Sequence, residues 1–452
     1  MENKNLYPRV LIVGQSFDSF TGPGITLSHL FGDWPAENLA VVSTLKTCPD
    51  LDKCNNYYRL GSSEFYYIWP VSSFVKHRRS SGDIKSDIAF TQLKSSEDLQ
   101  KYWQDLTGHT PENNNFKQMI YQLDDLIGGE EFVRKVSLSD ELVKWIETFK
   151  PELIYSHTES IMLIDLINQL YERFKIPIVI HMMDDWPATI YKEKILSPFL
   201  RYWINREFVK LLSRTKLFLG ISSKMCSAYQ IKYRKQLIPF HNPIDLDFWV
   251  QASHQKVEKH FEFSLLYRGR VGLAINSSLE DVCDVVEDLY RLGVNIRFDI
   301  YITPLMDEQI KIRLERKDSV FVHPPTPYSD IPGSLAAADL LVLCYDFDRE
   351  SITYIHFSMP TKVSEYMASG TPILVYAPPD TAVFDYAEKE KWGYIVSQNN
   401  KEQVKQAIIY LMKNNDLRAQ LGRHARELAV KNHDALIVKE EFRSCLYSAV
   451  NG

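Results

Sequence analysis

The strongest constraint on the fold of this chain is the alternation of short apolar runs with longer segments of helical periodicity, which continues through most of its 452 residues. The apolar runs are rich in β-branched residues and lack the strict polar alternation of a half-exposed strand. Strands of that kind are buried on both faces of a parallel sheet, and helices usually connect parallel strands. The pattern therefore predicts an α/β fold.

This alternation starts twice along the chain. One series opens at residues 9–14, and a second opens at residues 263–267, after the motif HNPIDLDFW. The Asn242-Pro243 step and the polar stretch 251–260 between the two series are typical of a linker. We therefore expect two doubly wound halves, each with its own first strand.

The boundaries of these parts follow from the same pattern. We expect domains at residues 1–245 and 246–430, and a final helix, 431–452, that crosses back toward the first domain. Ligands bind at the carboxyl ends of the strands in such folds, so we expect a cleft there between the two halves. The expected strands are 9–14, 40–45, 151–157, 176–183, 217–222, 263–267, 297–302, 320–323, 340–344, 372–376 and 393–396, and helices separate them.

One stretch of the first half departs from this rhythm. Residues 47–115 are polar and contain the motifs YYRLG and EFYYIWP. We interpret this stretch as part of a loop-and-helix insertion at about 47–129. Insertions of this size in enzymes often shape a substrate site.

Composition and charge exclude several classes of protein. With 45% hydrophobic and 24% charged residues, the chain is ordinary globular material rather than a disordered one. Its net charge of −6 argues against a nucleic-acid-binding protein. The six cysteines form no CxxC pair, which argues against a zinc site or a disulfide framework. The chain has neither a signal-peptide pattern nor a long apolar run, so we expect a cytoplasmic protein without a membrane-spanning helix.

The loop after the first expected strand reads GQSFDSFTGPGITLSHL. Gly22 and Gly24 precede an expected helix start near Ile25. Small residues allow backbone N–H groups to approach an anion at a helix N-terminus. The alternative is an ordinary turn between a strand and a helix, which the spacing alone favours.

The first strand of the second half ends in YRGRVG. Arg268 and Arg270 flank Gly269, which allows close approach of the backbone to a ligand. A guanidinium matches phosphate oxygens and stays charged at all ordinary pH values. A pair of solvated arginines at a strand end is the equally weighted alternative.

The segment HFSMPTKVSEYMASGTPILVY, residues 356–376, is the most informative. Pro360 and Thr361 resemble a helix start, with Thr361 as a candidate cap. Lys362 in the first turn opposes the helix dipole unless an anion docks there. Glu365 is spaced to accept hydrogen bonds from the vicinal hydroxyls of a ribose. The alternative is a surface helix with an ordinary Lys–Glu pair.

Polar residues also end two strands of the first half. Asp184 and Asp185 follow the strand that contains His181, and mutual repulsion raises the pKa of such a pair toward that of a general base. The alternative is that one of them caps the next helix. His157 ends another strand and is expected to face the cleft, although a lone histidine there is more often structural. His181 is expected to be packed.

The expected helix 198–216 has two distinct faces. Leu200, Ile204, Phe208 and Leu211 form an apolar stripe, and Arg206, Lys210 and Arg214 follow another line. The basic line, together with Lys76-His77-Arg78-Arg79, suits contact with an anionic membrane leaflet. We favour the alternative, an amphipathic helix that covers a sheet.

The order of these motifs resembles the GT-B glycosyltransferases, specifically the retaining family 4 type. The resemblance spans nearly the whole chain except about 47–129, and its most specific part is 359–376. It is carried by GPGITLSHL, PELIYSH, IPIVIHMMDDWP, HNPIDLDFW, YRGRVG, MPTKVSEYMASGTPILVY, AAADLLVLCY and WGYIV.

The resemblance implies two Rossmann-like domains facing across a cleft, with C-terminal helices packed back on the first domain. The second domain would bind a nucleotide-sugar, UDP- or GDP-linked, and the first would hold the acceptor. In the positions of this chain, Glu365 would bind the donor ribose. Arg270, with the backbone of Thr361 and Lys362, would hold the diphosphate, and Gly22 and Gly24 would approach it from the other side. The resemblance implies no metal and no cofactor beyond the nucleotide-sugar co-substrate.

The sequence departs from the family pattern at three places. Phe357 stands where the first of two paired glutamates is usual, which affects the contact to the transferred sugar. Ile275 stands where a lysine is frequent, and Lys362 would supply that charge. Met183-Asp184 replaces His-Asp, which makes Asp184 the preferred catalytic group beside Arg270 and Lys362. Asp185 and His157 are assigned to the acceptor side, and Arg268 and Gly269 to the donor.

We therefore expect a hexosyltransferase that acts with retention on a saccharide or lipid-linked saccharide in surface polysaccharide assembly. Departure of a nucleoside diphosphate develops about two negative charges, which fixed cations and helix-end amides would stabilise. A lipid-linked acceptor would place the protein at the cytosolic membrane face. Two alternatives stay open: an epimerase that acts on the nucleotide-sugar itself, and a non-catalytic subunit that assists another transferase.

Overall fold

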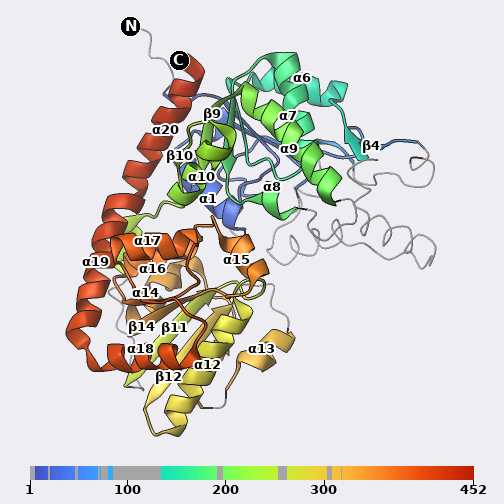
Figure 1. Cartoon of the computed structure of the whole chain (residues 1–452). Helices are drawn as coiled ribbons and strands as arrows, with labels where there is room; N and C mark the ends of the chain where they lie inside the picture. The colour runs from blue at the N-terminus through green and yellow to red at the C-terminus, as the bar shows by residue number, and fades with distance from the viewer. Residues whose placement is uncertain are drawn as a thin grey trace. The chain divides into compact units, whose positions relative to one another are not determined.

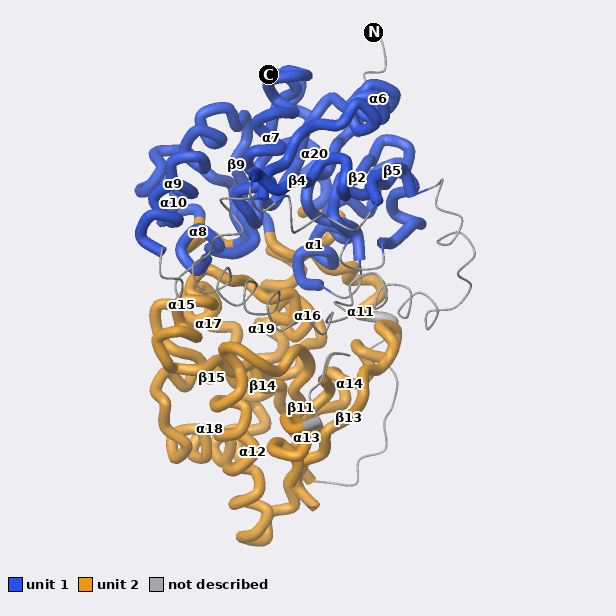
Figure 2. Tube along the Cα trace, turned by 90° about the vertical axis from the view of Figure 1, so that its right-hand side faces the viewer, with its two compact units in different colours: residues 1–221, 226–240, 439–452 blue, residues 222–225, 241–438 orange. Residues whose placement is uncertain are grey.

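A computed structural model describes residues 6–18, 21–45, 49–69, 72, 80–84, 134–190, 197–252, 262–302, 308–316 and 318–452. The described chain forms two compact units, coloured separately in Figure 2. Unit 1 comprises residues 1–221, 226–240 and 439–452, and unit 2 comprises residues 222–225 and 241–438. Most of the expected insertion and the basic run 76–79 lie outside the described residues.

Unit 1 is built on an eight-stranded sheet with the order β10-β9-β8-β7-β1-β2-β3-β5. All of its neighbouring strands pair in parallel except β3 and β5, which are antiparallel. The central strands are entirely buried, as the lack of polar alternation predicted. The strands are β1 (Val10–Val13), β2 (Leu39–Ser43), β3 (Tyr57–Arg59), β5 (Gly82–Asp83), β7 (Leu153–Ser156), β8 (Ile178–Met182), β9 (Thr215–Gly220) and β10 (Ile238–Pro239).

Helices stand between most successive parallel strands of unit 1 along the chain, because a crossover connection is needed to join two parallel strands. Serine side chains cap two of them: Ser139 accepts from an N–H of α6, and Ser160 from an N–H of α7. A separate antiparallel pair, β4 (Phe65–Tyr67) and β6 (Arg134–Val136), completes the unit. The helices are α1 (Gly22–Leu30), α6 (Asp140–Phe149), α7 (Ile161–Phe174), α8 (Trp186–Thr189), α9 (Ser197–Arg214) and α10 (Ser223–Tyr233).

The end of the chain returns to unit 1 through the helix α20 (Ala435–Asn451). Phe442 of this helix is completely buried. Its ring lies edge-on to those of Phe31 and Tyr155, with centroid distances of 5.0 and 6.0 Å. Edge-to-face aromatic pairs of this kind add to the stabilisation that burial of the rings provides. The last helix is therefore part of the core of unit 1.

Unit 2 contains a six-stranded, all-parallel sheet with the order β13-β12-β11-β14-β15-β16. Numbered from its first strand, this is the 3-2-1-4-5-6 order of a dinucleotide-binding fold. The order reverses between β11 and β14, and ligands bind at such a switch point. The strands are β11 (Phe263–Gly269), β12 (Ile296–Ile302), β13 (Val320–His323), β14 (Leu340–Cys344), β15 (Ile373–Tyr376) and β16 (Tyr394–Val396).

The helices of unit 2 cover its sheet (Figure 1). Contact between α16 and α19 is especially close, because a Cβ atom on Gly422 would lie 2.0 Å from the carbonyl oxygen of Gly370. The helices are α11 (Leu246–Ala252), α12 (Asn276–Arg291), α13 (Glu308–Leu314), α14 (Ile331–Ala337), α15 (Arg349–Ile355), α16 (Thr361–Ser369), α17 (Ala382–Glu390), α18 (Lys401–Lys413) and α19 (Asn415–His433).

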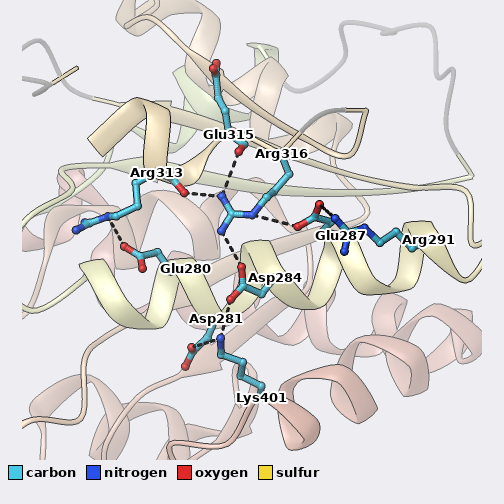
Figure 3. A network of polar contacts seen from close by, with 9 residues as sticks. All are labelled: Glu280, Asp281, Asp284, Glu287, Arg291, Arg313, Glu315, Arg316 and Lys401. Atoms are coloured by element: carbon cyan, nitrogen blue, oxygen red, sulfur yellow. Dashed lines mark hydrogen bonds and ion pairs between the residues drawn. The ribbon is translucent and has the colours of Figure 1, made fainter. Parts of the chain in front are cut away.

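The outer face of α12 carries a network of ion pairs (Figure 3). Arg316, which follows α13, contacts Asp284 at 2.7 Å and Glu287 at 3.2 Å. Lys401, at the start of α18, contacts Asp284 at 2.6 Å and Asp281 at 3.3 Å. We call these five residues the α12 network. It ties Arg316 and the start of α18 to α12 through pairs of opposite charge.

The expected α/β fold with two doubly wound units is confirmed, and each expected strand is present within two residues of its predicted ends. One boundary was wrong. The first helix begins at Gly22 rather than near Ile25, because Thr21 caps it by accepting a hydrogen bond from the N–H of Gly24. Among the described residues, no helix has the length and apolar character needed to cross a bilayer.

Candidate functional site

The helix α16 begins at the carboxyl edge of the unit 2 sheet without a side-chain cap. Its N-cap residue is Pro360, which makes no side-chain capping hydrogen bond. The helices on either side of it in the sequence are both capped, α15 by Asp348 and α17 by Thr381. Thr361 is the first helical residue, so the expectation that its side chain caps the helix was wrong. The first N–H groups of α16 therefore remain available for an external anion.

Lys362 places its ammonium group beside this helix start. Its Nζ atom donates a hydrogen bond of 2.8 Å to the hydroxyl of Tyr267 and lies 4.4 Å from the centroid of that ring. Burial lowers the pKa of Lys362 to about 8. Within the described residues no carboxylate forms an ion pair with it, so the charge has no counterion there. An anionic ligand would supply one.

Gly269 makes room for this lysine. Its φ of +148° lies in the region that favours glycine, and a Cβ atom there would lie 2.7 Å from the Nζ of Lys362. The sequence predicted Gly269 as a position of close approach to a ligand. The structure shows close approach to the Lys362 side chain.

Arg268 and Arg270 have different environments. The guanidinium of Arg268 is half-buried and donates to the hydroxyl oxygen of Thr326 at 2.7 Å and to its carbonyl oxygen at 3.1 Å. Burial lowers the pKa of Arg268, although it stays a cation at neutral pH. Arg270 is exposed, and its guanidinium makes a long contact of 3.4 Å to the hydroxyl of Tyr354. Arg270 is therefore the less constrained of the two cations.

Glu365 lies on α16 one turn after the helix start. Burial raises the pKa of its carboxyl group to about 7, although Arg268 and Lys362 act in the opposite direction. In the described structure its carboxylate accepts no hydrogen bond. A half-buried carboxylate without a donor matches the prediction that Glu365 accepts hydrogen bonds from a ligand.

Two tyrosines that the sequence analysis missed hold this group together. The Tyr267 hydroxyl accepts from Lys362 and donates to the carbonyl oxygen of Arg270 at 2.5 Å. The Tyr366 hydroxyl accepts from the N–H of Arg268 at 2.8 Å and donates to its carbonyl oxygen at 3.2 Å. Both side chains are completely buried, and in the sequence they resemble ordinary core aromatics. We call Tyr267, Arg268, Lys362, Glu365 and Tyr366 the α16 cluster.

Gly22 and Gly24 lie at the start of α1, beyond the carboxyl end of β1. A carboxylate already occupies this helix end: Asp18 accepts hydrogen bonds from the N–H of Thr21 at 2.7 Å and from its hydroxyl at 3.0 Å. A Cβ atom on Gly24 would lie 2.4 Å from the Asp18 carboxyl group. The sequence analysis missed Asp18, because an aspartate in a loop does not reveal by its position which backbone groups its side chain contacts. The predicted contact of the two glycines with phosphates stays a prediction.

His157 ends a chain of buried hydrogen bonds beyond β7. His181 contacts the carbonyl oxygen of Phe240 through Nε2 at 2.9 Å, so this nitrogen must donate. Its Nδ1 then accepts from the Tyr155 hydroxyl at 2.6 Å. The Tyr155 oxygen accepts in turn from His157 Nε2 at 3.3 Å, which makes the Nδ1 atom of His157 an acceptor. That atom is buried and has no hydrogen-bond partner in the part of the chain that the structure describes, and burial holds the pKa of His157 well below its ordinary value. The expectation that His181 is packed is confirmed.

Asp184 and Asp185 follow β8, as the sequence predicted, but their environments differ. Asp184 is exposed, and Asp185 is half-buried and accepts a hydrogen bond of 2.6 Å from the hydroxyl of Tyr229. Asp185 occupies the N-cap position of α8 yet makes no capping hydrogen bond with its side chain. The alternative that one of the two aspartates caps the next helix therefore does not hold for Asp185, which occupies the cap position. The catalytic assignment of Asp184 stays a prediction.

The helix α9 covers the sheet, as the favoured interpretation held. Its expected apolar stripe is buried at Leu200, Ile204, Phe208 and Leu211. In the basic line, Arg206 pairs with Glu207, and Arg214 pairs with Glu172. The described residues contain no group of three histidine, cysteine or acidic side chains placed to hold a metal ion.

Comparison with known proteins adds a family and a fold. Residues 307–428 match the model of the family described as "Glycosyl transferases group 1". Curated protein sequences give no match. The matched residues lie wholly within unit 2 and include α16.

Several solved structures are similar over nearly the whole chain. HepE of Anabaena in complex with UDP-glucose has 12% identity and a TM-score of 0.56, with 98% of this chain and 100% of that chain covered. A glycosyltransferase of Rickettsia africae has 10% identity and a TM-score of 0.57, with 97% and 99% covered. Sucrose-phosphate synthase of Thermosynechococcus elongatus has 12% identity and a TM-score of 0.60, with 97% and 98% covered. The chain therefore has the GT-B fold of glycosyltransferases, and its residues 307–428 carry the pattern of the group 1 family.

Proposed function

We propose that this protein is a glycosyltransferase that moves a hexosyl unit from a nucleotide-sugar donor to a saccharide or lipid-linked saccharide. The observation that carries the proposal is the α16 cluster at the switch point of the unit 2 sheet. It combines a helix start without a side-chain cap with a lysine and a carboxylate that have, among the described residues, no ion-pair partner and no hydrogen-bond donor respectively. A nucleoside diphosphate supplies the complementary groups, because its phosphates are anionic and its ribose carries vicinal hydroxyls.

The proposed chemistry needs stabilisation of a leaving group. As the bond between the sugar and the diphosphate breaks, negative charge develops on the departing phosphate oxygen. Lys362, Arg270 and the first N–H groups of α16 would stabilise that charge, and Glu365 would hold the ribose. We propose transfer with retention and without a metal, as the resemblance implies, with Asp184 beside the acceptor. HepE, which has been solved with UDP-glucose, supports a uridine donor.

The test is a thermal-shift screen against UDP-, GDP-, ADP- and CMP-sugars, followed by transfer assays with the best donor. We expect one donor class to raise the melting temperature of the wild-type protein and Lys362→Ala to abolish that shift. If no nucleotide-sugar stabilises the wild type, or if Lys362→Ala and Glu365→Ala both retain full transfer, the proposal is wrong.

One observation favours a second candidate, a non-catalytic subunit that assists another transferase. Phe357, at the position of the first family glutamate, is only 9% exposed, and its ring lies 4.3 Å from that of His356. No carboxylate is available at this position to contact a transferred sugar. A protein that binds the donor but transfers nothing across a broad acceptor panel would support this candidate. Accumulation of an epimer without acceptor would support the epimerase instead.

A further inference from the structure

A groove with two adjoining hollows runs along α7 and α9 in unit 1, which lie side by side (Figure 1). The first hollow, of about 210 Å³, is lined by residues of β6, α7 and α9, among them Lys135, Asp165, Trp203 and Glu207. The second, of about 450 Å³, continues along the same two helices. Asp165 lines both hollows, so they form one continuous surface. None of these residues belongs to the sites described above.

The walls of the first hollow combine three kinds of surface. The indole of Trp203 provides a flat apolar face, and the Nζ of Lys135 lies 5.0 Å from its ring centroid. Ile161 and Ile164 of α7 lie behind the hollow as buried aliphatic residues. Asp165 and Glu207 contribute acceptors, and Arg134 and Lys135 contribute donors. The two carboxylates and the two cations balance in formal charge.

This balance discriminates among ligands. A phosphate or another compact anion would meet the carboxylates of Asp165 and Glu207 and is disfavoured there. A purely apolar ligand would remove water from four charged groups and offer them no polar contact in exchange, which is unfavourable. A saccharide satisfies both kinds of group, because its hydroxyls donate to carboxylates and accept from cations, while the C–H face of its ring packs on an aromatic side chain. The second hollow extends the polar lining with Asn168, Gln169 and Lys210.

The groove is held open by contacts among its own elements. Gln169 donates from Nε2 to the carbonyl oxygen of Val136 at 2.9 Å, which joins α7 to β6, and to Asp165 at 3.1 Å. Burial raises the pKa of Asp165, and the nearby Glu207 acts in the same direction. Glu207 itself accepts from Arg206 at 2.7 Å. These bonds fix the polar side chains before any ligand arrives, which lowers the entropy lost on binding.

We propose that the α7–α9 groove is a saccharide-binding subsite that holds a distal part of the glycan acceptor. This inference rests on the proposed function for the identity of the acceptor, although saccharide binding itself does not require catalysis. On α7 the first hollow begins at Ile161, four residues after His157. His157 directly follows β7 at the edge where the acceptor is expected. An acceptor that fills both hollows would present more than one sugar unit.

The experiment measures saccharide binding without any donor. The full-length protein is applied to an array of neutral and uronate-containing oligosaccharides of two to eight units, as wild type and as Trp203→Ala, Asp165→Asn and Trp69→Ala. Trp69 is 80% exposed and lies outside the groove, so it controls for nonspecific stacking. We expect wild type and Trp69→Ala to bind the same glycans, and Trp203→Ala and Asp165→Asn to lose at least tenfold in affinity while keeping the wild-type melting temperature within a few degrees.

The outcomes separate this inference from the proposed function. If the array shows no ligand, or if Trp203→Ala and Asp165→Asn bind as wild type does, the subsite is wrong even when nucleotide-sugars stabilise the protein. If the array shows groove-dependent binding but no nucleotide-sugar binds, the subsite stands and the transferase proposal falls. With an active enzyme, the two groove variants are expected to raise the acceptor KM at least fivefold and to leave the donor KM and donor hydrolysis unchanged.

Discussion

Two groups of charged side chains in unit 2 show how differently a protein can use the same residue types. In the α12 network, Arg316 and Lys401 each contact two carboxylates. In the α16 cluster, the ammonium of Lys362 lies against the hydroxyl and ring of Tyr267, and among the described residues it pairs with no carboxylate. Glu365 accepts no hydrogen bond from a described residue. In the first group, both cations are already paired with carboxylates. In the second group, Lys362 and Glu365 would gain such partners when a ligand binds.

The difference also appears in the direction of the pKa shifts. In the α12 network, hydrogen bonds and attraction raise the pKa of Lys401 and lower that of Asp284, so both charges are stabilised. In the α16 cluster, burial lowers the pKa of Lys362 and raises that of Glu365, so both charges are destabilised. Destabilised charges at a strand edge are typical of binding and catalytic sites. Substitutions in the α16 cluster should therefore reduce transfer, and substitutions in the α12 network should reduce the stability of the fold and leave transfer unchanged.

The largest effect is expected for Lys362→Ala. Removal of one fixed cation at a developing charge costs about 10²- to 10³-fold in rate. We expect a loss of that size in transfer and no thermal shift with donor. Lys401→Ala removes the same charge from the α12 network and should transfer at the wild-type rate. Equal losses in both variants would mean that the two groups do not differ in function.

Gly269→Ala should have the next largest effect. The added Cβ atom would lie 2.7 Å from the Nζ of Lys362 and displace it. We expect transfer to fall about 10- to 100-fold, as misplacement of a catalytic group by about 1 Å does. Gly272→Ala is the matched control, because Gly272 has a similar φ of +143° but an added Cβ atom there would meet no other atom within 4 Å. If both alanines reduce transfer equally, backbone strain rather than displacement of Lys362 is responsible.

Glu365→Gln should weaken donor binding about 10- to 100-fold, because a hydrogen bond to a charged acceptor contributes about 1.5–3 kcal/mol. Isothermal titration with the best donor measures the change. Glu402→Gln, on α18, carries the same substitution away from the cluster and should bind the donor as wild type does. An unchanged donor affinity in Glu365→Gln would remove this carboxylate from the donor site.

Donor affinity should be highest between about pH 7 and pH 8. Below about pH 7 Glu365 gains a proton and loses its negative charge, and above about pH 8 Lys362 loses its positive charge. We expect affinity to decline several-fold per pH unit on both sides. Lys362→Arg keeps its charge at high pH and should lose the alkaline decline. A flat profile for the wild type would contradict the assignment.

The smallest effect on activity is expected for Arg316→Ala. Its loss breaks two ion pairs of the α12 network, and partly exposed pairs contribute about 0–1 kcal/mol. Chemical denaturation should show a decrease of about 1 kcal/mol in the free energy of unfolding, and transfer should not change. A strong loss of transfer would show that the α12 network acts on the reaction.

Much of the fold could be predicted because buried parallel strands leave a clear apolar signature, as in β8 and β14. The positions of Arg268, Lys362 and Glu365 could also be predicted, since Arg268 precedes Gly269 at a strand end and the other two lie in the first turns of a helix that follows Pro360. The roles of Tyr267 and Tyr366 could not be predicted from the sequence. Tyr267 and Lys362 are 95 residues apart, and only the tertiary structure shows that they meet. The same holds for the α7–α9 groove, whose walls come from three elements and whose residues form no motif.

The contact between Gly422 and Gly370 bears on how the α16 cluster is held before a ligand arrives. Where two backbones touch without an intervening side chain, no flexible side chain can rearrange to let one helix slide along the other. The far end of α16 is thus anchored, and its free amides keep their position in space whether or not the site is filled. An incoming anion would meet a rigid receptor, and a bulkier residue at 422 would disturb recognition from the opposite end of the helix.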